Sequence, residues 1–86
     1  MLPDHTLIER ARQGDELAFA AVLERYKDRV VGYLGRLTGC RARAEDLAQD
    51  AFIRFYERLD RYEERGKLGA YLVRMATRVF LSEERR

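Results

Sequence analysis

The sequence has few of the residues that build disulfides, metal sites and catalytic centres. It contains one cysteine, one histidine, one proline and no tryptophan in 86 residues. The single cysteine, Cys40, excludes an intramolecular disulfide, and no histidine or second cysteine stands near it at a metal-ligand spacing. We therefore interpret Cys40 as a free thiol in a reducing compartment, and we expect neither a cofactor nor a bound metal.

Further absences concern membranes and catalysis. The residues after Met1 lack the basic segment and apolar run of a signal peptide, and no apolar stretch approaches the length of a membrane span. We expect a cytoplasmic protein without membrane insertion. His5 lies near the chain start, and the sequence has no glycine-rich loop that could hold a phosphate. These features predict that the protein is not an enzyme.

Apolar residues recur at intervals of three and four, which is the period of amphipathic helices. No alternating run typical of a strand and no internal repeat is present, and the only proline is Pro3. The sequence predicts an all-α fold in a single domain, residues 1–86: a compact bundle of three main helices plus a short N-terminal helix. We expect helices over about 4–13, 16–38, 42–59 and 67–82.

Individual residues predict the helix ends and the core. Gly14 should end the first helix, and Asp15 should cap the second. Gly32 and Gly35 lie inside the second helix, where each costs ~1 kcal/mol relative to alanine, so close packing, bending and simple tolerance are alternatives. The expected core residues share the apolar helix faces: Phe19, Val22, Leu23, Tyr26, Val30, Tyr33, Leu34, Leu37, Leu47, Ala48, Ala51, Phe52, Phe55, Tyr56, Leu59, Leu68, Leu72, Met75 and Val79.

Charge is distributed unevenly along the chain, although the net charge is only +2. Residues 1–60 contain ten Lys and Arg against eleven Asp and Glu, whereas residues 61–86 contain seven against four. A net charge of this size does not indicate a nucleic-acid binder by itself. The basic excess places any phosphate contacts in the last third of the chain.

A polar row runs along one side of the expected third helix. Glu45, Asp46, Gln49, Asp50 and Arg54 alternate with the core positions at helical spacing. From the residues alone, ordinary solvated surface is the simpler interpretation, and a docking strip for a basic partner helix is the alternative. Asp46 and Asp50 are also spaced to share a cation or act as paired acids, but the neighbouring amide and arginines fit a surface role better.

Three segments of the sequence match the motifs of a known family, which is more specific evidence of function than composition or charge. Residues 7–19 read LIERARQGDELAF, residues 44–52 read AEDLAQDAF, and residues 68–76 read LGAYLVRMA. In this order they resemble the patterns L-x-x-x-A-x-x-G-D-x-x-A-F, AEDLVQETF and FRAWLYRIA of region 2 in bacterial RNA polymerase sigma factors of the extracytoplasmic-function (ECF) group. The resemblance covers nearly the whole chain. It departs from the family at Leu68, where Phe is frequent, at Tyr71, where Trp is usual, and at Arg78 and Ser82, where Asn and Asp or Asn are common.

The resemblance implies a module of transcription initiation that recognises and helps melt the promoter −10 element. It implies docking on the β′ clamp helices of core RNA polymerase through Asp46, Gln49, Asp50, Ile53, Arg54 and Glu57. It also implies binding of the single-stranded non-template −10 strand, with one base in a loop pocket, through Tyr62, Glu64, Arg65, Lys67, Tyr71, Arg74 and Arg78. The terminal Arg85 and Arg86 are expected on the same side.

The sequence allows more than one role for Tyr71 and Tyr62, a further partner, and two origins of the chain. Aromatic residues at helical spacing are more often core, so packing is the favoured role of Tyr71, whereas Tyr62 is evenly balanced. An anti-sigma factor is a further partner that the family allows. The family normally continues into a domain that reads the −35 element, which these residues do not include, so an excised fragment and a short natural form are both compatible.

Two other classes of protein are also compatible with this sequence. One is a helical protein-interaction bundle of the same fold that binds polymerase or a regulator without reading DNA. The other is an unrelated helix-turn-helix DNA binder, although the spacing of a recognition helix after a tight turn is not apparent.

Overall fold

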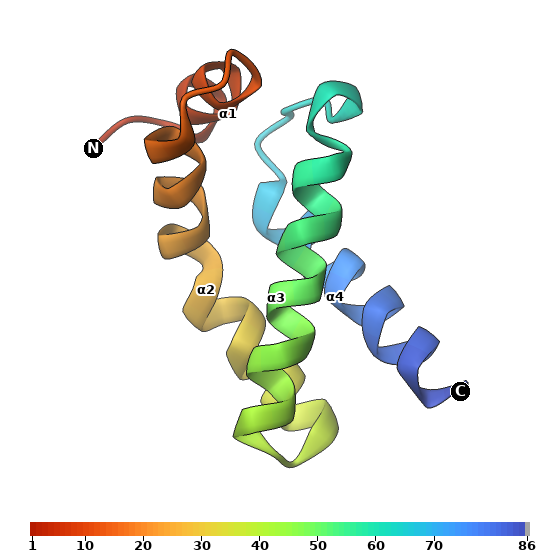
Figure 1. Ribbon diagram of the computed structural model, residues 1–86. Helices are drawn as coiled ribbons and strands as arrows, with labels where there is room; N and C mark the ends of the chain where they lie inside the picture. The colour runs from red at the N-terminus through yellow and green to blue at the C-terminus, as the bar shows by residue number, and fades with distance from the viewer. Residues whose placement is uncertain (86) are drawn as a thin grey trace.

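The structure is a computed structural model that describes residues 1–85, and its elements are all helical (Figure 1). The order is α1 (Asp4–Arg12), α2 (Glu16–Thr38), α3 (Arg41–Glu57), the short 3-10 helix η1 (Leu59–Arg61) and α4 (Leu68–Glu84). Helices α2 and α3 run antiparallel to each other, and α4 packs against both. The predicted all-α bundle of three main helices and a short leading helix is confirmed.

Local chemistry explains the start of α2 and the ends of α1 and α2. The Asp15 carboxylate accepts hydrogen bonds from the amides of Leu17 at 3.0 Å and Ala18 at 3.2 Å, which confirms it as the N-cap of α2. Gly14 has a φ of 94° and Gly39 a φ of 68°, left-handed conformations that favour glycine where helices stop.

The end of α3 differs from the expected continuous helix to residue 59. The amide of Arg58 bonds to the carbonyls of both Arg54 and Phe55, so the helix tightens into η1 after Glu57. Helix α4 begins at Leu68 and continues to Glu84, two residues further than expected.

The core lies where α2, α3 and α4 meet, with α1 closing one end. Leu34, Phe55 and Leu72 are fully buried, and Phe52 is 7% exposed, as the apolar periodicity predicts. Four expected core residues are partly buried, namely Phe19, Leu23, Tyr26 and Tyr33, and two are exposed: Tyr56 is 57% exposed and Leu37 is 42% exposed. Tyr56 lies at the edge of the core and contacts Phe19 only edge to face, whereas Leu37 lies in the last turn of α2, where the bundle ends.

The three glycines inside helices differ in the space around them: two lie in open surroundings and one is crowded. An added Cβ at Gly35 would meet nothing within 4 Å, and one at Gly32 would meet only the tip of Arg36 at 3.8 Å. Close packing therefore does not explain these two glycines, which leaves bending or tolerance. Gly69 is the crowded position, because its Cβ would collide with the guanidinium of Arg29 and lie 3.2 Å from the Tyr26 ring.

Helix α1 is fastened to α2 through Asp4. Its carboxylate forms an ion pair with Arg25 at 2.7 Å and accepts a hydrogen bond from the hydroxyl of Tyr26. Burial, followed by this hydrogen bond, raises the pKa of Tyr26 to about 12, so the hydroxyl remains a donor at neutral pH. Within residues 1–85, no helix combines the length and apolar character that crossing a bilayer requires.

Candidate nucleic-acid interface and partner surface

Helix α3 exposes a polar face made of Asp46, Gln49, Asp50, Ile53, Arg54 and Glu57, called here the α3 polar face. Five of these residues are exposed, Arg54 is half-buried, and Ile53 is 49% exposed. Within residues 1–85 neither Asp46 nor Asp50 has an ion-pair partner, whereas the adjacent Glu45 lies 3.9 Å from Arg41. The face therefore carries negative charge that the fold itself does not neutralise.

An apolar groove lies beside this face, between α2 and α3, and the sequence patterns did not indicate it. It has a volume of about 210 Å³ and is lined by Leu23, Lys27, Val31, Glu45, Ala48, Gln49 and Phe52. Gln49 belongs to both the groove and the α3 polar face. A partner helix on this surface would thus meet acidic groups next to an apolar floor.

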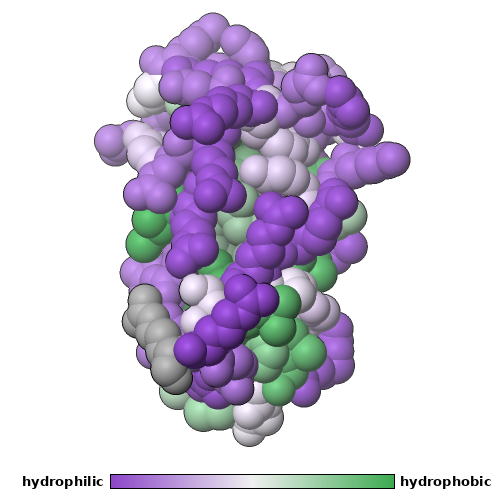
Figure 2. Space-filling model, turned by 90° about the vertical axis from the view of Figure 1, so that its right-hand side faces the viewer, coloured by the Kyte–Doolittle hydropathy of each residue, from purple (hydrophilic) through white to green (hydrophobic). Residues whose placement is uncertain are grey.

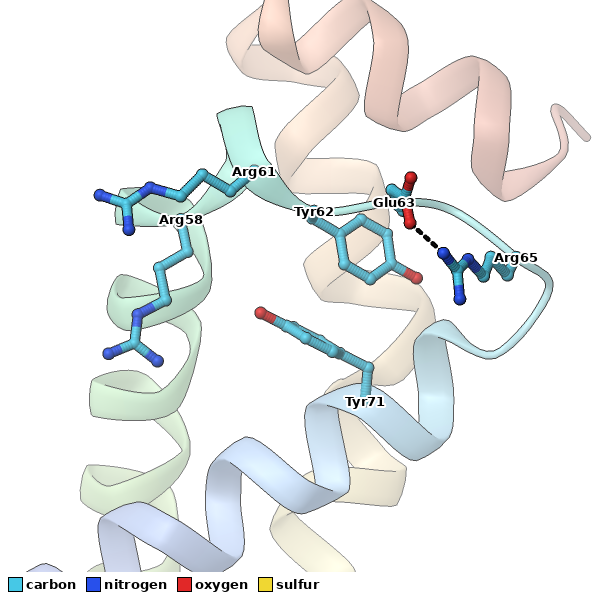
Figure 3. Close-up of a pocket in the computed structure, with 6 residues that line it drawn as sticks. All are labelled: Arg58, Arg61, Tyr62, Glu63, Arg65 and Tyr71. Atoms are coloured by element: carbon cyan, nitrogen blue, oxygen red, sulfur yellow. Dashed lines mark hydrogen bonds and ion pairs between the residues drawn. The ribbon is translucent and has the colours of Figure 1, made fainter.

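The loop between η1 and α4 forms a pocket with two tyrosines at its centre. The rings of Tyr62 and Tyr71 are 4.7 Å apart between centroids, and each also contacts Phe55, at 5.4 and 5.7 Å. The pocket has a volume of about 320 Å³ and is lined by Arg58, Arg61, Tyr62, Glu63, Arg65 and Tyr71 (Figure 3). We call this hollow the tyrosine pocket.

The tyrosine pocket has basic groups on both sides of its rings. In Figure 3, Arg58 and Arg61 come from the end of α3 and from η1, while Arg65 lies across the loop beside Glu63. Arg65 and Glu63 form an ion pair. Arg58 and Arg61 were not among the expected site residues. The signal that could have found them is a pair of arginines four residues and one residue before Tyr62.

A neighbouring hollow of about 240 Å³ extends from the same tyrosines towards α4. It is lined by Tyr62, Glu63, Arg65, Lys67, Tyr71 and Arg74, so five of the expected DNA-binding residues lie together. Arg78 is exposed one helical turn beyond Arg74 and lines neither hollow. Arg85 is exposed after the end of α4, and Arg86 lies outside the described residues.

Glu64 has a different position from the one expected of a base-reading group. It is half-buried, and its carboxylate accepts hydrogen bonds from the Tyr62 hydroxyl at 2.7 Å and from the Gly66 amide at 2.9 Å. Burial and the bond to Glu64 raise the pKa of Tyr62 well above its ordinary value. The Tyr62 hydroxyl therefore stays protonated and holds the loop together from inside.

The two tyrosines are packed and also line the hollows. Tyr62 is only 7% exposed, and Tyr71 is half-buried against Phe55 and Tyr62. The packing role favoured for Tyr71 is present, and Tyr62 is even more enclosed. Neither ring is a free-standing stacking platform, so a base could contact only the ring surface that faces the pocket.

Several cations around these hollows have no ion-pair partner within residues 1–85. Arg58, Arg61, Lys67, Arg74 and Arg78 are exposed and make no ion pair with any residue in the part of the chain described. Figure 2 shows the face on the right-hand side of Figure 1, where long hydrophilic side chains cover most of the surface. Unpaired basic groups around aromatic walls can attract a nucleic-acid backbone and hold a base.

Comparisons with known proteins agree with this architecture. The family described as Sigma-70 region 2 matches residues 22–86. The ECF RNA polymerase sigma factor SigW of Bacillus subtilis is 35% identical over 79 residues, which are 92% of this chain and 42% of that protein. BldN, an ECF RNA polymerase sigma factor of Streptomyces coelicolor, is 37% identical over 71 residues, 81% of this chain and 27% of its own length.

The ECF RNA polymerase sigma-E factor of Escherichia coli K12 is similar over a comparable region. It is 32% identical over 75 residues, which are 87% of this chain and 39% of that protein. The chain thus spans about two fifths or less of the length of these relatives.

Proposed function

The chain belongs to the Sigma-70 region 2 family, in its ECF group, and from this premise we propose that it joins core RNA polymerase to promoter DNA in the cytoplasm. In this proposal the α3 polar face docks on the β′ clamp helices. The tyrosine pocket and the cations around it hold the single-stranded non-template −10 strand. The protein performs no chemical reaction, and its two surfaces act through binding alone.

The unpaired cations around the tyrosine pocket are the observation that carries the DNA part of the proposal. Arginines and lysines without an ion-pair partner among the described residues can neutralise phosphates without first breaking an ion pair. The pocket volume of about 320 Å³ lies in the range of small-ligand sites, and its aromatic walls suit an unstacked base. Binding the single-stranded form more tightly than the duplex would shift the equilibrium towards open DNA.

The docking part of the proposal is supported by the α3 polar face. Asp46 and Asp50 are exposed acids without ion-pair partners among residues 1–85, and Ile53 adds an exposed apolar side chain beside them. A partner helix with basic residues would form charge-assisted hydrogen bonds to the carboxylates. Its apolar residues could then occupy the groove between α2 and α3.

Binding to matched single-stranded and duplex −10 oligonucleotides tests the DNA part directly. We expect tighter binding of the single strand. A preference for the duplex would contradict the proposal and favour a helix-turn-helix mode of binding. If neither form binds while polymerase does, the protein is an interaction bundle that does not read DNA.

Replacing Arg78 with alanine should weaken binding to single strands of many sequences by a similar factor. The exposed guanidinium lines neither hollow, so we expect it to contact phosphate and not a base edge. Loss of one phosphate contact should reduce the slope of log K against log salt by about 0.7. A salt titration of the parent and the variant measures this slope. Arg36→Ala removes the same charge from an exposed position in the last turn of α2, which is not part of the proposed DNA surface, and should leave the slope unchanged.

Replacing Arg65 with alanine should change base preference at one position of the strand. Arg65 lines both hollows, and its guanidinium could donate to a base edge there. Loss of such a contact typically changes discrimination by ~1–3 kcal/mol. Affinities for a set of oligonucleotides with single-base substitutions measure the effect. An equal loss of affinity for every base would show that the loop contacts only phosphate.

A further inference from the structure

We propose that Arg12, in the last turn of α1, is a positioning residue that sets the shape of the tyrosine pocket and hence its choice of base. The inference rests on the proposed function, because it assumes that a base of the single strand enters this pocket. Arg12 lies before residues 22–86, the part that the family match covers. Arg12 lines a separate hollow with His5, Glu9, Tyr62 and Glu64, but it lines neither of the two hollows next to Tyr71. Its effect on the tyrosine pocket would therefore pass through the loop.

The guanidinium of Arg12 reaches the turn that carries the pocket. Its Nε donates to the carbonyl of Leu59 at 3.1 Å, and its Nη2 donates to the carbonyl of Tyr62. Its Nη1 completes the set with the Glu9 carboxylate at 3.2 Å. These contacts join α1 to residues 47 and 50 positions later in the chain. The Arg12 side chain is 26% exposed, so water competes only partly for its donors.

The two carbonyls belong to a short and weakly bonded turn. Leu59 is the first residue of η1 and Tyr62 follows its last residue. In this single 3-10 turn the Arg61 amide donates to the Arg58 carbonyl at 3.0 Å, and the Tyr62 amide donates to the Leu59 carbonyl at 3.2 Å. Such short turns have poor hydrogen-bond geometry, so a second donor to the Leu59 carbonyl adds support to the turn. One planar guanidinium can satisfy both carbonyls at once.

Tyr62, which lines the tyrosine pocket, is held through both its side chain and its backbone. Glu64 holds the hydroxyl of Tyr62, and Phe55 supports its ring. Arg12 holds the backbone carbonyl of the same residue. Without Arg12 the Tyr62 ring keeps its packing, but its backbone and the following loop lose their connection to α1. The expected result is a shifted and looser pocket in a protein that still folds.

Helix α1 can serve as a fixed support because it has its own attachment to α2. Asp4 is held by Arg25 and Tyr26, at the opposite end of α1 from Arg12. Leu7 and Ile8, between these two attachments, are buried in the core. The position of Arg12 is therefore set by the bundle and not by the loop. A rigid support of this kind is what a selective pocket requires, since small displacements of lining groups reduce selectivity.

The test separates base selectivity from general affinity. A randomised single-stranded pool is first selected on the parent protein. The enriched oligonucleotide is then made with each of the four bases, and with an abasic site, at the position where the parent discriminates most. For Arg12→Gln we expect about a tenfold loss of discrimination between the best and worst base, the size of an effect produced by one or two charge-assisted hydrogen bonds. Affinity for the abasic strand should stay within twofold of the parent.

Two further variants control for charge and folding. Arg10→Gln removes the same charge from an exposed site on the same turn of α1 and should leave discrimination unchanged. Arg12→Lys keeps the charge but has no planar fork to span both carbonyls, so we expect an intermediate loss. If Arg12→Gln is not folded at the assay temperature, Arg12→Lys carries the test.

Each outcome has one meaning. Undiminished discrimination in folded Arg12→Gln or Arg12→Lys would overturn the inference. So would an equal loss in Arg10→Gln, or a loss of affinity for the abasic strand as large as for the intact strands. If the parent itself discriminates at no position, the proposed base-reading role of the tyrosine pocket fails, which is a result distinct from the failure of Arg12 as a positioning residue.

Discussion

Replacing Phe55 with alanine should lower the free energy of unfolding by about 3–5 kcal/mol. Phe55 is fully buried, and its ring contacts Phe19 on α2, Tyr62 in the loop and Tyr71 on α4. Truncation removes the residue at which three separate segments meet and leaves a cavity between them. A domain of this size typically has only ~5–15 kcal/mol of stability, so much of the population should unfold on modest heating.

Thermal unfolding followed by circular dichroism measures this effect. For a domain of about 60–100 residues, 1 kcal/mol corresponds to about 4–8 °C, so the midpoint should fall by at least about 12 °C. Ile53→Ala is the matched control, because Ile53 lies on the same helix but is 49% exposed. It should change the midpoint only slightly. A Phe55→Ala midpoint close to that of the parent would mean that the core face of α3 is wrongly assigned.

The fold follows from the sequence where local patterns decide it. Phe55 and Leu72 lie at positions that helical periodicity turns towards the core, and Asp15 caps α2 as its residue type predicts. Periodicity gives the direction of a side chain but not how far the neighbouring helices extend over it. Tyr56 and Leu37 show this, because both point from an apolar stripe and yet lie at the edge or end of the bundle.

The site could be predicted only in part. The resemblance indicated the loop, and the structure brings Tyr62, Arg65 and Tyr71 together in it. It could not show that the Glu64 carboxylate turns inward to bond the loop to itself. Nor could it place Arg58, because the change from α3 into η1 decides where that side chain points. Contacts between a side chain and distant backbone carbonyls, such as those of Arg12, leave no pattern in a sequence.

Substitutions on the α3 polar face and in the tyrosine pocket should affect polymerase docking and DNA binding separately, because the two surfaces are built from different segments. The α3 polar face runs along α3 from Asp46 to Glu57, whereas the tyrosine pocket is built from Arg58 just after α3, from η1, from the loop and from the start of α4. A change on one face that preserves folding should leave the other function intact. This independence makes a charge reversal on the α3 polar face informative.

Replacing Asp50 with arginine should weaken association with the β′ clamp helices at least tenfold while leaving DNA binding and folding near parent values. The Asp50 carboxylate is exposed and has no ion-pair partner within residues 1–85, so its removal costs the fold little. In the variant, an arginine would oppose a basic partner, and like charges in an interface cost several kcal/mol. It would also stand one turn from Arg54, an i,i+4 repulsion of only ~0.2–0.5 kcal/mol.

Calorimetric titration with a fragment of the β′ clamp helices, at low and high salt, measures the loss. Asp28→Arg is the matched control, because it makes the same charge change at an exposed position on α2 that does not line the groove next to the α3 polar face. If both reversals weaken binding equally, the effect comes from net charge and not from this face. If Asp50→Arg binds as the parent does while circular dichroism shows native helicity, the clamp helices dock elsewhere on the bundle. A loss confined to Asp50→Arg that shrinks at high salt would show that this carboxylate faces a basic partner, since screening weakens that repulsion.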